Sequence, residues 1–167
     1  GLAELTENQL IANHAKTLQH KIALAQLKAL KAQIQPHFLF NALSTISSLC
    51  RTDGMQARHL ILDLASYFRS TIEGDQDYLT VAEELEHAQA YLRIENARLS
   101  ERLKVSYHID PTCLTQKIPT YLLQPLIENA IKYGISELTC QGELNIVIVP
   151  VTNNALLIRI SNTTADA

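Results

Sequence analysis

The stretch QIQPHFLFNAL at residues 33–43 sets a histidine directly after a proline in an otherwise helical sequence. Pro36 removes one helical hydrogen bond, so we expect a kink there in a helix that spans about residues 4–52. Four polar residues lie three or four positions apart and therefore share one face of this helix: His37, Asn41, Ser44 and Ser48. Another face is expected to be apolar: Leu39, Leu43, Ile46 and Leu49. His37 is therefore expected in solvent, where a neutral imidazole can act as a nucleophile; the alternative is an ordinary surface histidine.

Two apolar stripes precede this stretch, over residues 18–34, and a second helix is expected at about residues 55–73 after the turn at Thr52-Asp53-Gly54. Its expected apolar face holds Leu60, Leu64, Phe68 and Ile72. Two helices joined by a short turn make a hairpin, which leaves apolar surface uncovered. Pairing of two hairpins into a dimeric four-helix bundle would cover that surface.

The rest of the chain mixes helices with strands. Thr80 and Glu83 fit a capping box that opens a helix over about 81–102, and residues 104–109 alternate as a strand. A helix is expected over about 119–135, with Pro119 in its first turn. Two strands, 143–152 and 155–161, flank an Asn-Asn hairpin turn. We therefore expect an α+β chain with a small antiparallel sheet, divided into domains 1–76 and 77–167.

The second segment that carries chemistry is IPTYLLQPLIENAIKYG at residues 118–134. Asn129, Lys132 and Tyr133 share one face of the expected helix, and Glu128 adjoins that face. An amide oxygen can ligate Mg²⁺, and an ammonium group can balance phosphate charge. An ordinary amphipathic helix with a solvated Glu128–Lys132 pair is the alternative.

Composition excludes several classes of protein. The five glycines are scattered and form no G-x-G, which excludes the Walker and dinucleotide-binding loops. A net charge of −3 and an aromatic content of 5% disfavour a nucleic-acid partner. Three cysteines without a C-x-x-C pattern fit a reducing cytoplasm. Any nucleotide site must therefore use another kind of phosphate-binding structure, or part of that structure lies outside these residues.

Together, PHFLFN at 36–41 and LLQPLIENAIKYG at 122–134 resemble the sensor histidine kinases of the LytS/YehU type. The stretch LEHAQAYLRIENAR at 85–98 resembles the segment that joins the two domains of that family. The resemblance extends over residues 24–162. It implies a helical hairpin for dimerisation and phosphorylation, followed by a truncated α/β-sandwich ATP-binding domain of the Bergerat type.

The same resemblance implies roles for single residues. His37 would be phosphorylated from ATP, and Asn41 would position the reacting group or water. Asn129 would ligate Mg²⁺, with Glu128 and Lys132 near the phosphates. One departure involves the nucleotide end, because Tyr133 stands where the family commonly has His. Asn162 stands near the place where the family commonly carries an Asp, or sometimes an Asn, that reads the adenine amino group. Phe38 follows the histidine, so no acidic residue adjoins it.

The implied partners are a second copy of the chain and the receiver domain of a response regulator, with ATP and Mg²⁺ as cofactors. Contact with a membrane would come only through a sensor region outside these residues, so the chain is expected to be the cytoplasmic portion of an inner-membrane sensor. Glycine-rich boxes are expected beyond residue 167, and residues 1–167 alone are expected to be inactive. The alternative is a non-catalytic dimeric scaffold or phosphotransfer module with a degenerate ATP domain.

Overall fold

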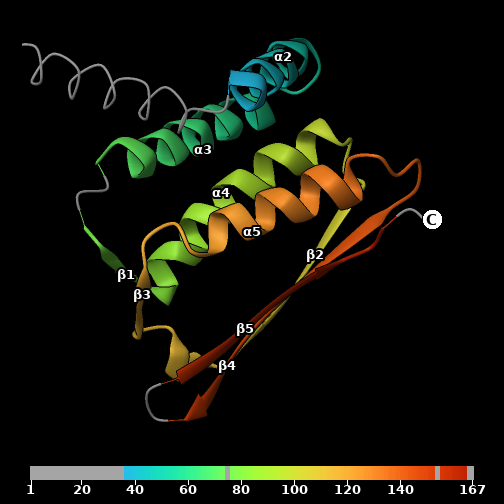
Figure 1. Ribbon diagram of the computed structural model, residues 1–167. Coiled ribbons are helices and arrows are strands. Elements are labelled where there is room, and N and C mark those ends of the chain that lie inside the picture. Colours follow the sequence, from blue (N-terminus) through green and yellow to red (C-terminus); the bar gives the residue numbers. More distant parts are fainter. Residues whose placement is uncertain (1–35, 74–75, 153–154, 165–167) are drawn as a thin grey trace, which may run out of the picture. The chain divides into compact units, whose positions relative to one another are not determined.

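The structure, a computed structural model, describes residues 36–73, 76–152 and 155–164 (Figure 1). The chain divides into two units between residues 39 and 40. The expected stripes over 18–34 and the kink before Pro36 lie outside the described residues. No helix in the described ranges is both long enough and apolar enough to cross a membrane. The domain boundary expected near residue 76 stays a prediction.

Helices α2 (Pro36–Thr52) and α3 (Gly54–Glu73) confirm the expected pair and the turn between them. Asp53 sits in that turn, and its Oδ1 accepts from the Gln56 N–H at 2.9 Å, which caps the start of α3. Only part of the expected apolar face of α2 is buried, because Ile46 is buried whereas Leu43 is 48% exposed. The buried residues are Phe38, Ala42 and Ile46, a face turned by about one residue.

The sheet positions the second half of the chain. Strand β4 (Gly142–Thr152) lies between β2 (Leu103–Ile109), which runs parallel to it, and β5 (Ala155–Asn162), which runs antiparallel. The expected all-antiparallel sheet was therefore wrong for β2. A long crossover that contains a helix returns the chain to the same end of the sheet, and this makes a parallel pair possible. A separate antiparallel pair joins β1 (Tyr78–Thr80) to β3 (Lys117–Pro119).

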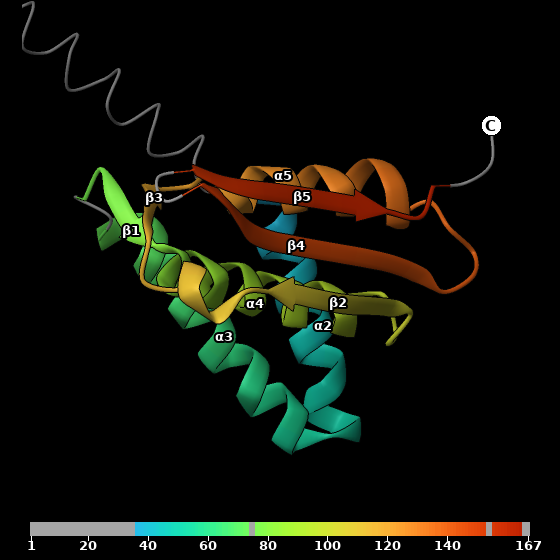
Figure 2. The same ribbon diagram turned by 90° about the horizontal axis from the view of Figure 1, so that it is seen from below.

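Two helices lie side by side between α3 and the sheet, α4 (Val81–Arg98) and α5 (Leu123–Ala130) (Figures 1 and 2). Helix α5 continues as a π-helix, η2 (Ile131–Ile135), and a short 3₁₀ turn, η1 (Pro111–Cys113), follows β2. The core between helices and sheet is aliphatic: Ile94, Leu123, Ile127, Ile131, Leu144, Ile146 and Ile148 are almost fully buried. The α+β class is thus confirmed, whereas the four-helix bundle and the complete sandwich stay predictions.

The expected start of the helix over about residues 119–135 was wrong. Pro119 lies in β3, and the helix begins only at Leu123, so Pro125 is the proline of its first turn. A proline in that position costs no intrahelical hydrogen bond, because the first N–H groups of a helix have no partner within it. Pro125 therefore requires no bend in α5.

Candidate functional site

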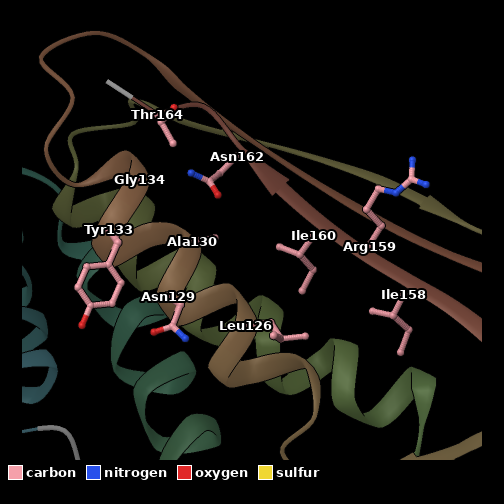
Figure 3. A pocket seen from close by; sticks show the side chains of 10 residues that line it. All are labelled: Leu126, Asn129, Ala130, Tyr133, Gly134, Ile158, Arg159, Ile160, Asn162 and Thr164. Atoms are coloured by element: carbon pink, nitrogen blue, oxygen red, sulfur yellow. The ribbon is translucent and has the colours of Figure 1, made fainter. Parts of the chain in front are cut away.

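A cavity of about 720 Å³ lies between α5–η2 and β5 (Figure 3). Five lining residues come from the helical side: Leu126, Asn129, Ala130, Tyr133 and Gly134. Five come from β5 and the residues after it: Ile158, Arg159, Ile160, Asn162 and Thr164. The cavity is thus formed by two segments that the sequence separates by more than twenty residues.

The structure brings three of the expected site residues together at this cavity. Asn129, Tyr133 and Asn162 all line it, although Asn162 comes from the end of a different element. Lys132 does not line it, and its Nζ lies 4.9 Å from the centre of the Tyr133 ring. Glu128 does not line it either, because its carboxylate is bonded to Gln124 on another side of α5. The expected roles of Lys132 and Glu128 stay predictions.

The π-helical turn explains why Lys132 leaves the cavity face. The Ser136 N–H donates to the Ile131 carbonyl at 2.8 Å, a bond that spans five residues rather than four. Such a turn is wider than an α-helical one, so a residue three positions after Asn129 rotates further from its face. Tyr133, four positions on, stays at the cavity. Single π-helical turns occur frequently at functional sites.

Gly134 lets the helix and the end of β5 approach closely. A Cβ atom at this position would lie 1.8 Å from Asn162 Nδ2 and 3.2 Å from the Thr163 carbonyl oxygen. Asn162 Nδ2 donates to that same carbonyl at 3.0 Å. Any side chain at residue 134 would therefore displace the Asn162 amide (Figure 3).

The walls of the cavity are apolar, with amide groups toward one end. Leu126, Ile158 and Ile160 provide aliphatic surface, whereas the Arg159 side chain points away from α5 (Figure 3). Aliphatic walls suit a flat aromatic base, and a few polar groups suffice to orient it. The amide oxygen of Asn129 is a hard donor of the kind that Mg²⁺ accepts.

The start of α5 is held by a carboxylate from α4. Glu84 is buried, and its two oxygens accept from the Tyr121 N–H at 2.9 Å and the Leu123 N–H at 3.1 Å. Leu122, at the N-cap position, offers no side-chain acceptor. Tyr121 has a φ of 62°, a conformation that a bulky residue adopts only when the surroundings hold it. Glu84 thus fixes the turn that aims α5 at the cavity.

The far end of the helical segment is held in a similar way. Glu95 is buried on α4, and its Oε2 accepts from Arg98 Nε at 2.9 Å and Nη2 at 2.5 Å. The same Arg98 Nη2 donates to the Ser136 Oγ at 3.0 Å, directly after η2. Since Arg98 is paired with a carboxylate inside the protein, its guanidinium is a fixed donor. Helix α4 therefore positions both ends of α5–η2.

His37 and Asn41 lie at the start of α2, in one turn of helix. His37 is exposed, as the sequence predicts, and Asn41 is half-buried. The described residues contain no group of three or more His, Cys, Asp or Glu side chains suited to a metal ion.

Sequence reasoning missed the polar residues that hold the site: Glu84, Glu95, Arg98, Tyr67 and Gln124. Within the described residues, the buried polar or charged side chains are Glu84, Glu95 and Gln124. Glu84 bonds the start of α5 and Gln124 belongs to α5, whereas Glu95 acts through Arg98, which bonds Ser136. The sequence offers one signal for Glu84. Glu83 alone completes the capping box, so the pattern of the first turn gives the adjacent Glu84 no local hydrogen-bond partner. Tyr67 and Gln124 carry no comparable signal.

Comparison with known proteins gives consistent results. The histidine kinase family matches residues 25–103. The sensor histidine kinase BtsS of Escherichia coli (strain K12) is 40% identical over 146 residues, which are 87% of this chain and 26% of that protein. The sensor protein LytS of Oceanobacillus iheyensis is 37% identical over 163 residues, 97% of this chain and 28% of that protein. LytS of Staphylococcus saprophyticus is 39% identical over 163 residues, which are 97% of this chain and 27% of that protein. The chain thus spans about a quarter of the length of these relatives.

Proposed function

Since this chain belongs to the sensor histidine kinases, with LytS and BtsS among its relatives, we propose that it carries the phosphorylated histidine and part of the ATP-binding domain of such a kinase. The proposed reaction transfers the γ-phosphoryl group of ATP to a ring nitrogen of His37. A second transfer then passes that group to an aspartate of a response regulator. The observation that carries the proposal is the cavity, where Asn129, Tyr133 and Asn162 meet.

His37 acts as the nucleophile in the first transfer. A lone pair on one ring nitrogen forms the bond to the γ-phosphorus, and the bond from that phosphorus to the bridging oxygen breaks, so ADP leaves. The proton on the other ring nitrogen can then pass to water, because the side chain is exposed. Asn41, one turn further along α2, is proposed to orient the reacting group. Phosphoryl transfer depends mainly on such positioning and on charge neutralisation.

The cavity supplies the nucleotide side of the reaction. Leu126, Ile158 and Ile160 give the apolar walls for the adenine ring, and Asn162 is proposed to read its edge. Asn129 is proposed to hold Mg²⁺, and its hard amide oxygen fits that ion. When bound, Mg²⁺ neutralises charge on the phosphates.

Three further residues adjoin the phosphate end in this proposal. Tyr133 lines the cavity and can donate a hydrogen bond through its hydroxyl. Lys132 is exposed beside the Tyr133 ring, and its flexible side chain can reach anionic oxygens outside the cavity. Glu128 is proposed to reach the phosphates when the hydrogen bonds that hold its carboxylate to Gln124 and Tyr67 are weakened.

We also propose that the protein acts as a homodimer and transfers its phosphoryl group to a receiver domain. Exposed apolar side chains on the two helices of the hairpin support an interface there: Phe40, Leu43, Met55, Ile61 and Leu62. Any contact with a membrane is proposed to come from regions outside residues 1–167, with these residues on the cytoplasmic side.

Labelling with γ-phosphate-labelled ATP tests the role of His37. The full-length protein with Mg²⁺ should take up acid-labile label, and His37→Gln should abolish it. The matched control is His59→Gln, which changes an exposed histidine on α3 and should retain the label. Label that persists in His37→Gln, or that survives acid, would refute the assignment.

Binding of Mg·ATP tests the role of Asn129. Asn129→Ala should weaken binding by at least about 100-fold, since a metal ligand and its oriented charge are lost together. Asn145→Ala on β4, which does not line the cavity, should bind as the unmodified protein does. Equal affinity of both variants for Mg·ATP would remove Asn129 from the site. A protein that neither binds ATP nor labels His37 would instead be the non-catalytic scaffold.

A further inference from the structure

Three polar side chains meet between α3 and α5, on a side of α5 that does not line the cavity. Gln124 Nε2 donates to the Tyr67 hydroxyl oxygen at 3.1 Å and to Glu128 Oε1 at 2.9 Å. The Tyr67 hydroxyl in turn donates to the same Glu128 oxygen at 3.5 Å. The three groups therefore close a ring in which the carboxylate accepts from both partners. We refer to Tyr67, Gln124 and Glu128 as the α3–α5 cluster.

Packing fixes the position of Tyr67 within this cluster. Its side chain is only 1% exposed, and its ring lies 5.4 Å from that of Phe68 and 6.1 Å from that of Tyr91, centre to centre. Gln124 is buried as well. Polar groups that are buried must keep their hydrogen bonds, because each one lost inside the protein is costly. A movement of α3 would consequently disturb Glu128 as well as Tyr67.

The charge of the cluster also favours this arrangement. Burial, and after it the nearby Glu128 carboxylate, raise the pKa of the Tyr67 hydroxyl above its ordinary value. The hydroxyl is therefore neutral and can donate at any physiological pH. The partly buried Glu128 carboxylate accepts two hydrogen bonds and is held by charge-assisted bonds, which are stronger than neutral ones.

Glu128 and Asn129 are adjacent in the chain but serve different sides of the helix. Asn129 lines the cavity, whereas the Glu128 carboxylate is bonded within the α3–α5 cluster. We propose that Tyr67 is a positioning residue for phosphoryl transfer, which holds the Glu128 carboxylate away from the nucleotide cavity. This inference rests on the proposed kinase function. Displacement of α3 would break the Tyr67 contact and release Glu128 toward the phosphates. Helix α3 follows directly after the helix that carries His37.

A double-mutant cycle on the full-length protein tests the proposal. Tyr67→Phe removes the hydroxyl and should raise the initial rate of His37 labelling at least about threefold, and in a Glu128→Gln background the same change should alter the rate by less than about 1.5-fold. Gln124→Met removes both amide donors at similar volume and should behave in the same way. Tyr78→Phe, at an exposed tyrosine of β1, is the control and should have no effect.

Two results would overturn the proposal. One is a Tyr67→Phe effect of equal size in both backgrounds, which would mean that Tyr67 does not act through Glu128. The other is a rate that falls or stays unchanged when the hydroxyl is removed from otherwise intact protein. Labelling of His37 in the unmodified protein shows in the same experiment that the kinase function itself holds.

Thermal unfolding tests the contact between Tyr67 and Glu128 without a measurement of kinase activity. It compares the unmodified protein, the two single variants Tyr67→Phe and Glu128→Gln, and the double variant. The shifts in Tm of Tyr67→Phe and Glu128→Gln should fail to add by about 2 °C or more, because the two groups share hydrogen bonds. Additive shifts would refute the contact between them even in a protein without kinase activity. A coupled pair combined with no labelling of His37 would instead refute the proposed function.

Discussion

Helices α4 and α5 lie side by side but begin in different ways. The start of α4 is closed by its own sequence, where Thr80 Oγ1 accepts from the Glu83 N–H at 3.2 Å and Glu83 Oε2 accepts from the Thr80 N–H at 2.8 Å. The start of α5 is closed by Glu84, which comes from α4 and stands 37 and 39 residues before the groups that it binds. One helix is therefore positioned locally, whereas the other is positioned by tertiary structure.

This difference separates what could be predicted from what could not. The capping box is a pattern of four consecutive residues, and it predicts a helix from residue 81, where α4 begins. No capping box precedes Leu123, so the prediction rested on Pro119, which placed the start of the helix four residues too early. A helix whose start depends on a distant carboxylate leaves no local pattern to read.

Removal of the distant cap should have the largest effect. Glu84→Ala leaves the Tyr121 and Leu123 N–H groups without their acceptor, which should cost about 3 kcal/mol of unfolding free energy. Urea denaturation measures this loss. Glu86→Ala, an exposed acid on the same helix, is the control and should change stability little. If Glu84→Ala were as stable as the control, α5 would not depend on its distant cap.

Removal of the local cap should cost less. Thr80→Ala deletes two hydrogen bonds of the hydroxyl, which accepts from the Glu83 N–H and donates to Glu83 Oε2, and should lower stability by about 1 kcal/mol. Thr80→Ser keeps the hydroxyl and should recover most of it in the same denaturation experiment. A Thr80→Ala loss as large as that of Glu84→Ala would show that local and distant caps are equivalent here.

The local cap should also depend on pH. Hydrogen bonds from the Thr80 backbone and side chain lower the pKa of Glu83 below its ordinary value. A depressed pKa contributes stability that is present above the pKa of the unfolded chain, about 4.3, and that is lost as pH falls through the folded value. Relative to Glu83→Gln, the unmodified protein should therefore lose more Tm between pH 5 and pH 3. Parallel curves for the two proteins would contradict this.

The smallest effect is expected at the first turn of α5. Pro125 is exposed, and its missing N–H is one that the helix would not have bonded. Pro125→Ala should therefore change stability by less than about 0.5 kcal/mol. A loss above 1 kcal/mol would mean that the fixed φ of proline, rather than Glu84, sets the start of this helix.

The residues of the candidate site that belong to continuous motifs could be predicted from the sequence, whereas the contacts that depend on tertiary packing could not. His37 and Asn129 belong to continuous motifs, and the structure places the first in solvent and the second at the cavity. Asn162 was named from the resemblance, and its neighbours come from a different element. Glu128 was expected at the phosphates, but its contacts with α3 depend on tertiary packing that no spacing in α5 reveals.

The approach of Gly134 to Asn162 has an evolutionary consequence. Since a Cβ at residue 134 would overlap the Asn162 amide, the two positions cannot vary independently while the cavity keeps its shape. Among descendants of this gene, a side chain at 134 should be accepted mainly together with a smaller residue at 162. Two positions that are almost thirty residues apart in the sequence should then be inherited as a single unit of variation.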